Sequence, residues 1–551
     1  MTANQKDIHE LQQMELGVAG EEQLTEREKE LLRLERELNA KLDQELHDNP
    51  NKIPKAVWFI IPNEFGERFT FYGIKNLLQQ YFKTAVGLES IDAKVQTHTF
   101  NMLAYFSPLI GAAVSDSWLG KYHTIVYLSI VYFLGTILLA VLSINGLVAD
   151  FGSYPLWASM VPLALVALGT GGIKPCVSSH GGDQYLPHQT KALDWFFAIF
   201  YIAINGGALL GQFITPAIKA DVVCFGSACY FGAFILPAGV FGIALCIFIF
   251  GFRYYRIVPA TGEFLPWKAL KGTIYAVRHY SLATIEERQR RGNWLNFADE
   301  VVGPLFVDEI RLLGKVCGMI VPILFFWMIW EQQSTEWQEQ YEKMNKYWGS
   351  GELSTEQSAL FNTLFVVIFV PICNKFIYPF FERRDIRCTL LRRMAVGFLF
   401  TIISFAASGG LQYAVESNFD GKYSADGKQV ITCPNCLHGA WQLPQWALLS
   451  LGEAMLVPSG LQFTYTQVGR QMKSISSSFW LLCVSLGNLV VTAVEEALKS
   501  TSLQGPPKYF FYCALGLVAN GIFCFLATKY TYKEDRDTQI QSQVSKKSEK
   551  S

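Results

Sequence analysis

The chain has 551 residues, of which 51% are hydrophobic and only 17% are charged. Soluble domains carry about a quarter charged residues, so this composition argues against a soluble protein and indicates a membrane protein. The net charge of −1 provides no basic field for nucleic acid. No nucleophile–base pair, phosphate-binding glycine loop or zinc-type spacing is present, so we expect no enzyme activity, no metal and no cofactor.

The first segment, residues 1–53, is polar and lacks the apolar core of a cleavable signal peptide, so insertion is expected to start at an internal span. Within it, Leu31, Leu34, Leu38 and Leu42 form one helical stripe among charged residues. This pattern predicts either a solvated helix in a cytoplasmic tail or a docking helix for a partner.

Apolar runs of about 20 residues, long enough to cross a bilayer, recur along the rest of the chain. They predict an all-α integral membrane protein with about twelve transmembrane helices. The runs lie near residues 56–82, 97–115, 124–145, 155–178, 194–216, 228–252, 312–333, 358–381, 391–412, 443–466, 475–498 and 508–530.

The longest interruption falls between the sixth and seventh runs, which is typical of transporters built from repeats. We therefore predict two six-helix bundles, at 54–252 and 311–530. They are joined by a cytoplasmic linker at 253–310, and a disordered cytoplasmic tail follows at 531–551.

Lys and Arg in short loops predict the orientation. The segments after even-numbered runs are basic, at 120–123, 174–191 and 382–393, and the linker is basic as well. Segments on the other side, such as 417–442, contain few basic residues. Both termini and the linker are therefore expected in the cytoplasm, with the protein in the plasma membrane.

Two cysteine pairs are expected on the outer side, Cys224 with Cys229 and Cys433 with Cys436. Disulfides are permitted there, and the sequence leaves open whether either pair is bonded. A CxxC pair alone is two ligands short of a zinc site.

Charged residues inside the first run are its least expected feature. Glu64, Arg68, Tyr72 and Lys75 share one helical face, and Glu67 lies beside it. Each charge at mid-membrane costs roughly 2.5–3.5 kcal/mol on the insertion scale. Such a cluster needs partners and water, so it indicates a functional site more than a structural ion pair or headgroup snorkelling.

Two further charges interrupt apolar runs, Lys174 in the fourth and Glu453 in the tenth. The first half is thus positive at its centre and the second half negative, which fits a small zwitterion such as a di- or tripeptide. Amides and aromatic rings could hold its backbone and side chains, although plain helix packing explains any single ring equally well. These candidates are Asn205, Asn362, Tyr72, Tyr201, Trp327 and Trp480.

The stretch "EFGERFTFYG" resembles the ExxER motif of the proton-dependent oligopeptide transporter family, which has the major facilitator fold. "GAAVSDSWLGKYHTI", "LGTGGIKPCVSSHGGDQY", "FFAIFYIAINGGALLG", "FFWMIWEQQ", "YPFFERRDIR" and "LGEAMLVPSGLQFTYTQ" resemble other signatures of that family in the same order. The resemblance covers roughly residues 54–530.

The resemblance implies a proton-coupled symporter of di- and tripeptides in the lipid bilayer. It implies proton coupling by Glu64, Glu67, Arg68 and Lys174. It further implies peptide carboxylate binding by Arg68, Lys75 and Lys174, and peptide amine binding by Glu453. The alternatives are a nitrate or other small-solute carrier on the same fold, or a non-transporting peptide sensor.

Overall fold

The computed structural model describes most of the chain. The described residues are 26–49, 52–144, 147, 155–186, 188–258, 260, 265–419, 422–423, 430–432, 436–469, 472–499, 501 and 503–532. Cys433 and nearly all of the predicted C-terminal tail therefore lie outside the described residues.

Six long helices follow one another in the first half of the chain and pack around one apolar core. A π-helical segment, η1 (Ser115–Leu119), joins the second helix to the third, and Gly120 has a φ of +71°, which breaks the helical run there. The six helices are α3 (Val57–Thr84), α4 (Ser90–Val114), α5 (Gly120–Leu142), α6 (Trp157–Gly182), α7 (Thr190–Asp221) and α8 (Tyr230–Phe250).

The second half repeats this plan around its own core. Its first span is broken by 3-10 turns, and its second span, like that of the first half, runs into a π-helical segment. The elements are α12 (Pro304–Ile320), η5 (Val321–Ile323), α13 (Leu324–Trp330), η6 (Glu331–Ser334), α14 (Glu336–Glu342), η7 (Glu356–Ala359), α15 (Leu360–Ile372), η8 (Cys373–Ile377), α16 (Tyr378–Glu382), α17 (Leu390–Ser417), α18 (Leu443–Thr466), α19 (Lys473–Leu498) and α20 (Pro506–Lys529).

Each of the twelve predicted runs coincides with one of these helical segments. Among the described residues, nine segments are long and apolar enough to cross a membrane by length and composition, and one of them, Ser90–Leu142, contains both α4 and α5. Helix α3 falls outside that set because it carries five charged residues, and α18 because its Gln, Ser, Gly and Pro residues make it less apolar. The expected all-α, two-bundle fold is confirmed.

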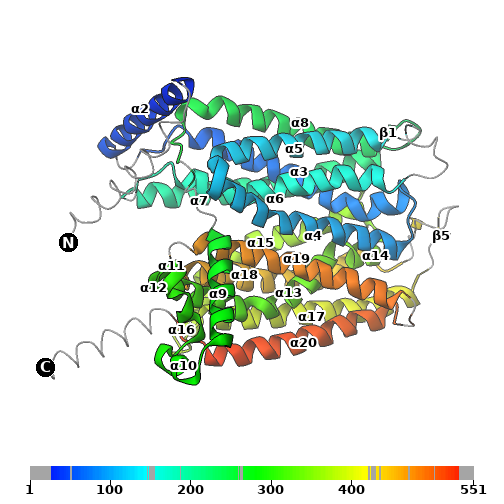
Figure 1. The fold of residues 1–551 in the computed structure, drawn as a ribbon. Helices are drawn as coiled ribbons and strands as arrows, with labels where there is room; N and C mark the ends of the chain where they lie inside the picture. The colour runs from blue at the N-terminus through cyan, green and yellow to red at the C-terminus, as the bar shows by residue number, and fades with distance from the viewer. Residues whose placement is uncertain are drawn as a thin grey trace.

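The two bundles lie side by side with their long helices roughly parallel (Figure 1). We call the end that holds α2 and α9 the linker end, and the end that holds strands β1 and β5 the hairpin end. Short antiparallel hairpins at the hairpin end are β1 (Val223–Cys224) with β2 (Ser227–Ala228), β3 (Tyr347–Trp348) with β4 (Gly351–Glu352), and β5 (Lys422–Tyr423) with β6 (Val430–Thr432).

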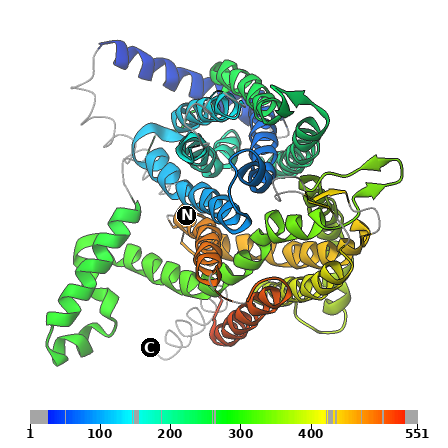
Figure 2. The same cartoon turned by 90° about the vertical axis from the view of Figure 1, so that its right-hand side faces the viewer.

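The connection between the bundles also folds. Helices α9 (Leu265–Leu282), α10 (Ile285–Arg291) and α11 (Asp299–Val302), with the 3-10 segment η4 (Trp294–Ala298), form a small helical unit before α12. Seen along the bundle axis, this unit extends sideways beyond the outline of the bundles (Figure 2).

The N-terminal helix α2 (Glu26–Asp48) docks on its own chain at the linker end. The Asn39 side chain exchanges two hydrogen bonds of 3.1 Å with the backbone of Ile257, and Leu46 is buried. Because the stripe leaves Leu34 56% exposed, the docking uses the C-terminal part of α2. A freely solvated helix, one of the two sequence-based alternatives, does not describe this part of α2.

Close helix approaches explain part of the glycine content. A Cβ on Gly111 of α4 would lie 2.2 Å from the carbonyl oxygen of Gly172 of α6, so only glycine fits there. Cys224 and Cys229 form a disulfide next to the β1–β2 turn, and Cys436 is also disulfide-bonded.

Candidate functional site

The charged face of α3 forms a compact cluster near the middle of the first bundle. Arg68 Nε lies 2.7 Å from Glu64 Oε1 and 3.2 Å from Glu67 Oε2. The side chains of the two acids are 2% and 1% exposed, and that of Arg68 is 15% exposed. Two carboxylates thus share one guanidinium, which leaves the cluster formally negative.

Both the acidic and the basic members of the cluster have hydrogen-bonding groups that are not used. Glu67 Oε1 accepts a hydrogen bond from Thr170 of α6, whereas its buried Oε2 has no hydrogen-bond donor. The ion pair with Glu64 uses the Nε–H of Arg68. The Nη groups of Arg68 form no hydrogen bond or ion pair among the described residues, so they can still bind a carboxylate with both nitrogens.

Lys174 of α6 is the second cation of this region. Its Nζ lies 3.7 Å from the ring centre of Phe71 and 4.5 Å from that of Tyr105. This Nζ is buried and has no hydrogen-bond acceptor among the described residues, so Lys174 forms no ion pair with Glu64 or Glu67 in this conformation. Aromatic faces stabilise an ammonium while leaving its N–H groups free.

Glu453 of α18 is the counterpart in the second bundle. Its Oε2 accepts hydrogen bonds from Trp330 Nε1 at 2.7 Å and from Asn362 Nδ2 at 2.9 Å. Asn362 also donates to Ser450 Oγ at 3.1 Å, which fixes its amide. Glu453 forms no ion pair among the described residues, so two neutral donors orient a carboxylate that still lacks a cation.

A small cavity lies between the two bundles next to these groups. It has a volume of about 20 Å³, room for one water molecule, and Tyr72, Lys75, Trp330 and Asn362 line it. Tyr72 and Lys75 come from α3 of the first bundle, whereas Trp330 and Asn362 both donate to Glu453 in the second. The structure therefore brings the α3 cluster and Glu453 to opposite sides of one central region.

The remaining expected residues divide into two groups. Tyr201 on α7 is 42% exposed, and the half-buried Asn205 donates to the Tyr201 carbonyl oxygen at 2.8 Å within the same helix. Trp327 and Trp480 are both buried in the core of the second bundle and pack edge to face at 6.0 Å. Trp330, which the sequence reasoning missed, contacts Glu453 directly.

Lys75 has a partner that the sequence did not reveal. Its Nζ lies 2.8 Å from Glu331 Oε2 across the bundle interface, with the two side chains 3% and 0% exposed. Asn101 of α4 donates to the same oxygen at 3.1 Å. In this conformation the Lys75 ammonium is therefore occupied by Glu331 and is not free for another anion.

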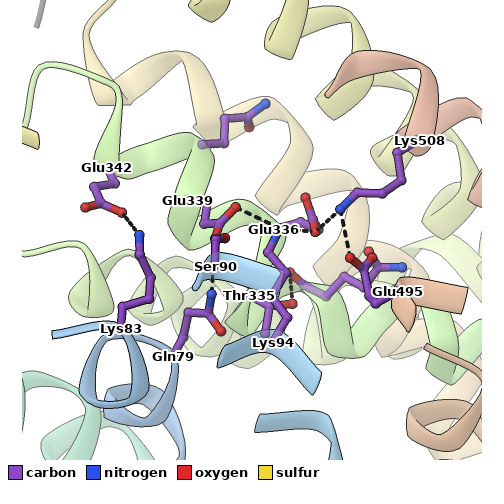
Figure 3. A network of polar contacts seen from close by, with 12 residues as sticks. Gln79, Lys83, Ser90, Lys94, Thr335, Glu336, Glu339, Glu342, Glu495 and Lys508 are labelled. Carbon is purple, nitrogen blue, oxygen red and sulfur yellow. Dashed lines mark hydrogen bonds and ion pairs between the residues drawn. The ribbon is translucent and has the colours of Figure 1, made fainter. Parts of the chain in front are cut away.

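Further lysines and acids meet at the hairpin end (Figure 3). Across the bundle interface, Lys94 of α4 contacts Glu336 at 2.5 Å and Glu339 at 2.7 Å. Within the second bundle, Lys508 of α20 contacts the same Glu336 at 2.6 Å. Other pairs across the bundles are Lys83 with Glu342 at 2.7 Å, Lys219 with Glu356 at 2.9 Å, and Lys499 with Asp92. We call these cross-bundle pairs, together with Lys75 and Glu331, the hairpin-end lock.

Every ion pair that joins the two bundles among the described residues belongs to this lock. Four of its lysines come from the first bundle and meet acids of the second, a complementarity that sets the register of the two surfaces. His98 adds neutral contacts, with Nδ1 2.8 Å from Asn488 Oδ1 and Nε2 3.1 Å from Thr335 Oγ1. The bundles are thus fastened together on the hairpin side of the Arg68 cluster.

A signal for the lock was present in the sequence. The stretch from Glu331 to Glu342 contains four glutamates directly after an apolar run, and lysines recur at Lys75, Lys83 and Lys94 in the first bundle. Counting opposite charges at matching depth in the two halves would have suggested this pairing.

The sequence of the chain is also similar to those of known proteins. The sequence model described as the POT family matches residues 122–510. Solute carrier family 15 member 2 of Danio rerio is 36% identical over 68% of this chain, and solute carrier family 15 member 1 of Mus musculus is 37% identical over 66%. The chain spans about half the length of these curated relatives, 53% and 52%.

A solved structure shares the architecture. The crystal structure of the POT family transporter PepTSo is 26% identical with a TM-score of 0.71, and the match covers 87% of this chain and 99% of that one. Both halves of the present chain are therefore included in the likeness. The chain belongs to the POT family.

Proposed function

We propose that the protein is a proton-coupled symporter of di- and tripeptides that works by alternating access in a lipid bilayer. The observation that carries this proposal is a set of three charged groups on opposite bundles that can still bind a ligand. Arg68 and Lys174 offer free N–H groups in the first bundle, and Glu453 offers a carboxylate without a cation in the second. A peptide with a free carboxylate and a free ammonium fits this arrangement.

The α3 cluster supports proton coupling. Glu67 has a buried carboxylate oxygen without a donor, next to a guanidinium shared with Glu64. A proton on Glu67 would remove one of the two negative charges that hold Arg68. Arg68 would then bind the peptide carboxylate more strongly, so that proton and peptide favour each other's binding. Asn205, Tyr72 and Tyr201 are proposed contacts for the peptide backbone and side chains.

The hairpin-end lock supports alternating access. The central cavity of about 20 Å³ is far too small for a dipeptide. The lock joins the two bundles between this cavity and the hairpin end. Loading from that side requires the lock to open, and delivery to the other side requires it to close again. Separation of the bundles exposes the lock residues to water, so opening exchanges buried ion pairs for hydrated charges.

The orientation and the location belong to the same proposal. Basic residues at the linker end favour a cytoplasmic linker and cytoplasmic termini, in the plasma membrane. The proposed domain boundaries are 54–252 and 311–530, with 253–310 between them. Helix α12 begins at Pro304 and carries the chain from that connection into the second bundle.

Uptake of a labelled dipeptide into proteoliposomes tests this function. An inward-directed acid gradient is expected to drive accumulation above the equilibrium level, and a protonophore is expected to abolish it. If nitrate competes with the labelled dipeptide for uptake and unlabelled dipeptide does not, an anion carrier is favoured instead. Saturable peptide binding without any uptake would favour a peptide sensor.

A further inference from the structure

Helix α9 presents three distinct faces. One face packs on the linker unit, where Ala276 is fully buried and a Cβ on Gly272 would meet Val302 at 3.2 Å. Leu295, Phe297 and Ala298 of η4 and Ile310 of α12 belong to the same buried cluster. The helix is therefore held firmly along one side, and its other sides are free to meet something else.

The second face is apolar and uncovered. Its four side chains stand at the spacing of one helical stripe, and each is about half exposed. They are Trp267 at 58%, Leu270 at 48%, Ile274 at 56% and Val277 at 54%. A stripe of this size that ends in a tryptophan is unusual for a surface in contact with water and is typical of a helix that lies in a membrane interface.

The third face is basic and lies next to the apolar stripe. Helix α9 contains Lys268, Lys271 and Arg278 and no Asp or Glu. Lys271 and Arg278 are exposed, and their side chains form no hydrogen bond or ion pair among the described residues. Basic side chains beside an apolar stripe match a surface of anionic lipid headgroups over acyl chains.

The placement of α9 fits such a surface. Its axis runs across the long bundle helices at the linker end, which is parallel to the plane of a membrane that they span (Figure 1). The linker unit also reaches sideways past the outline of the bundles (Figure 2), over the area that a surrounding bilayer would occupy. We propose that α9 is a lipid-binding element that docks its apolar stripe into the anionic leaflet at the linker end.

The test places a nitroxide label on the 551-residue chain in nanodiscs. The label is attached at Ile274→Cys on the apolar stripe or, as the control, at Arg290→Cys on α10, after the exposed Cys246 and Cys524 are replaced by Ser. In discs with about one third phosphatidylserine, the label at 274 should collide with oxygen and be shielded from a water-soluble nickel chelate. The label at 290 should remain accessible to the chelate.

Charge reversal separates lipid electrostatics from plain shielding. One basic residue near an anionic surface contributes about fivefold to binding. Lys271→Glu removes one positive charge and adds a negative one, so it should lower the docked-to-undocked ratio at 274 by about 5- to 25-fold. Lys41→Glu on the acidic helix α2, also an exposed lysine at the linker end, should leave it unchanged. Discs of phosphatidylcholine alone should lower the ratio in the unsubstituted protein.

Three results would overturn the proposal. The first is equal nickel accessibility at positions 274 and 290 in anionic discs. The second is shielding at 274 that does not change with lipid charge or with Lys271→Glu, which would mean that apolar contact alone covers the stripe. The third is an immobilised label at 274 that neither oxygen nor nickel reaches, which would indicate a protein partner on this face.

Discussion

Glu331→Gln tests how much one buried pair of the hairpin-end lock contributes to its closure. In the closed conformation the substitution leaves the Lys75 ammonium, 3% exposed, beside a neutral amide. Removing one partner of a buried ion pair costs about 3–5 kcal/mol, because the remaining charge stays desolvated. When the bundles separate at the hairpin end, water solvates Lys75 and this cost disappears.

The substitution should therefore shift the equilibrium toward an open hairpin end by roughly 10²- to 10⁴-fold, since each 1.36 kcal/mol is a factor of ten. The lower value is more realistic, because the new amide oxygen can still accept from Asn101 or Lys75. Replacing both partners, with Lys75→Gln added, removes the stranded charge and should restore most of the closed population.

Distances between spin labels across the hairpin end measure this shift. Asp221→Cys in the first bundle and Trp441→Cys in the second provide exposed positions. Glu352→Gln is the matched control, because its pair with Lys346 at 3.6 Å lies within one bundle and Glu352 is 47% exposed. A distance distribution for Glu331→Gln that equals those of the unsubstituted protein and the control would refute the reasoning.

Three further predictions concern coupling, packing and pH. Glu67→Gln should abolish accumulation driven by an acid gradient while peptide exchange continues; full accumulation in that variant would contradict the proposed role. Gly111→Ala should lower the melting temperature or prevent folding, because its Cβ would lie 2.2 Å from the Gly172 carbonyl, whereas Gly182→Ala meets nothing within 4 Å and should be neutral in a thermal-shift assay. The Lys52 ammonium holds the pKa of Glu45 below its ordinary value of 4.5, so this contact stabilises α2 docking above that pH and weakens as pH falls through the lowered pKa. The amide protection factors of residues 39–46, which correct for the intrinsic pH dependence of exchange, should accordingly be the same at pH 7 and pH 5.5 and fall only below about pH 4.5; a loss of protection already at pH 5.5 would contradict this.

Local patterns in the sequence predicted most of the fold. Apolar runs predicted the helices, and the predicted start of the second run at residue 97 was late because four of the seven residues at 90–96, among them Asp92 and Lys94, are polar. Helix α4 begins at Ser90, and Lys94 within this polar turn pairs with Glu336 and Glu339 at the hairpin end. The charged face of α3 followed from helical spacing, which is a local property.

Pairings between distant segments could not be predicted in the same way. Lys75 lies on the expected face, but its contact with Glu331 joins positions 256 residues apart and depends on how the bundles meet. Likewise, a sequence cannot show that Lys174 rests on the rings of Phe71 and Tyr105 without an acceptor. Trp330 was missed in favour of Trp327 because both belong to one aromatic run, and only the rotation of α13 decides which one meets Glu453.

The most direct test is a comparison of two peptides in two proteins. The affinities of alanyl-alanine and its N-acetylated form are measured by competition in the unsubstituted protein and in Glu453→Gln. A hydrogen bond to a charged group contributes about 1.5–3 kcal/mol, so acetylation should weaken binding roughly 10- to 100-fold in the unsubstituted protein. In Glu453→Gln the two peptides should bind within about threefold of each other. An undiminished preference for the free amine in that variant would show that Glu453 does not receive the peptide ammonium.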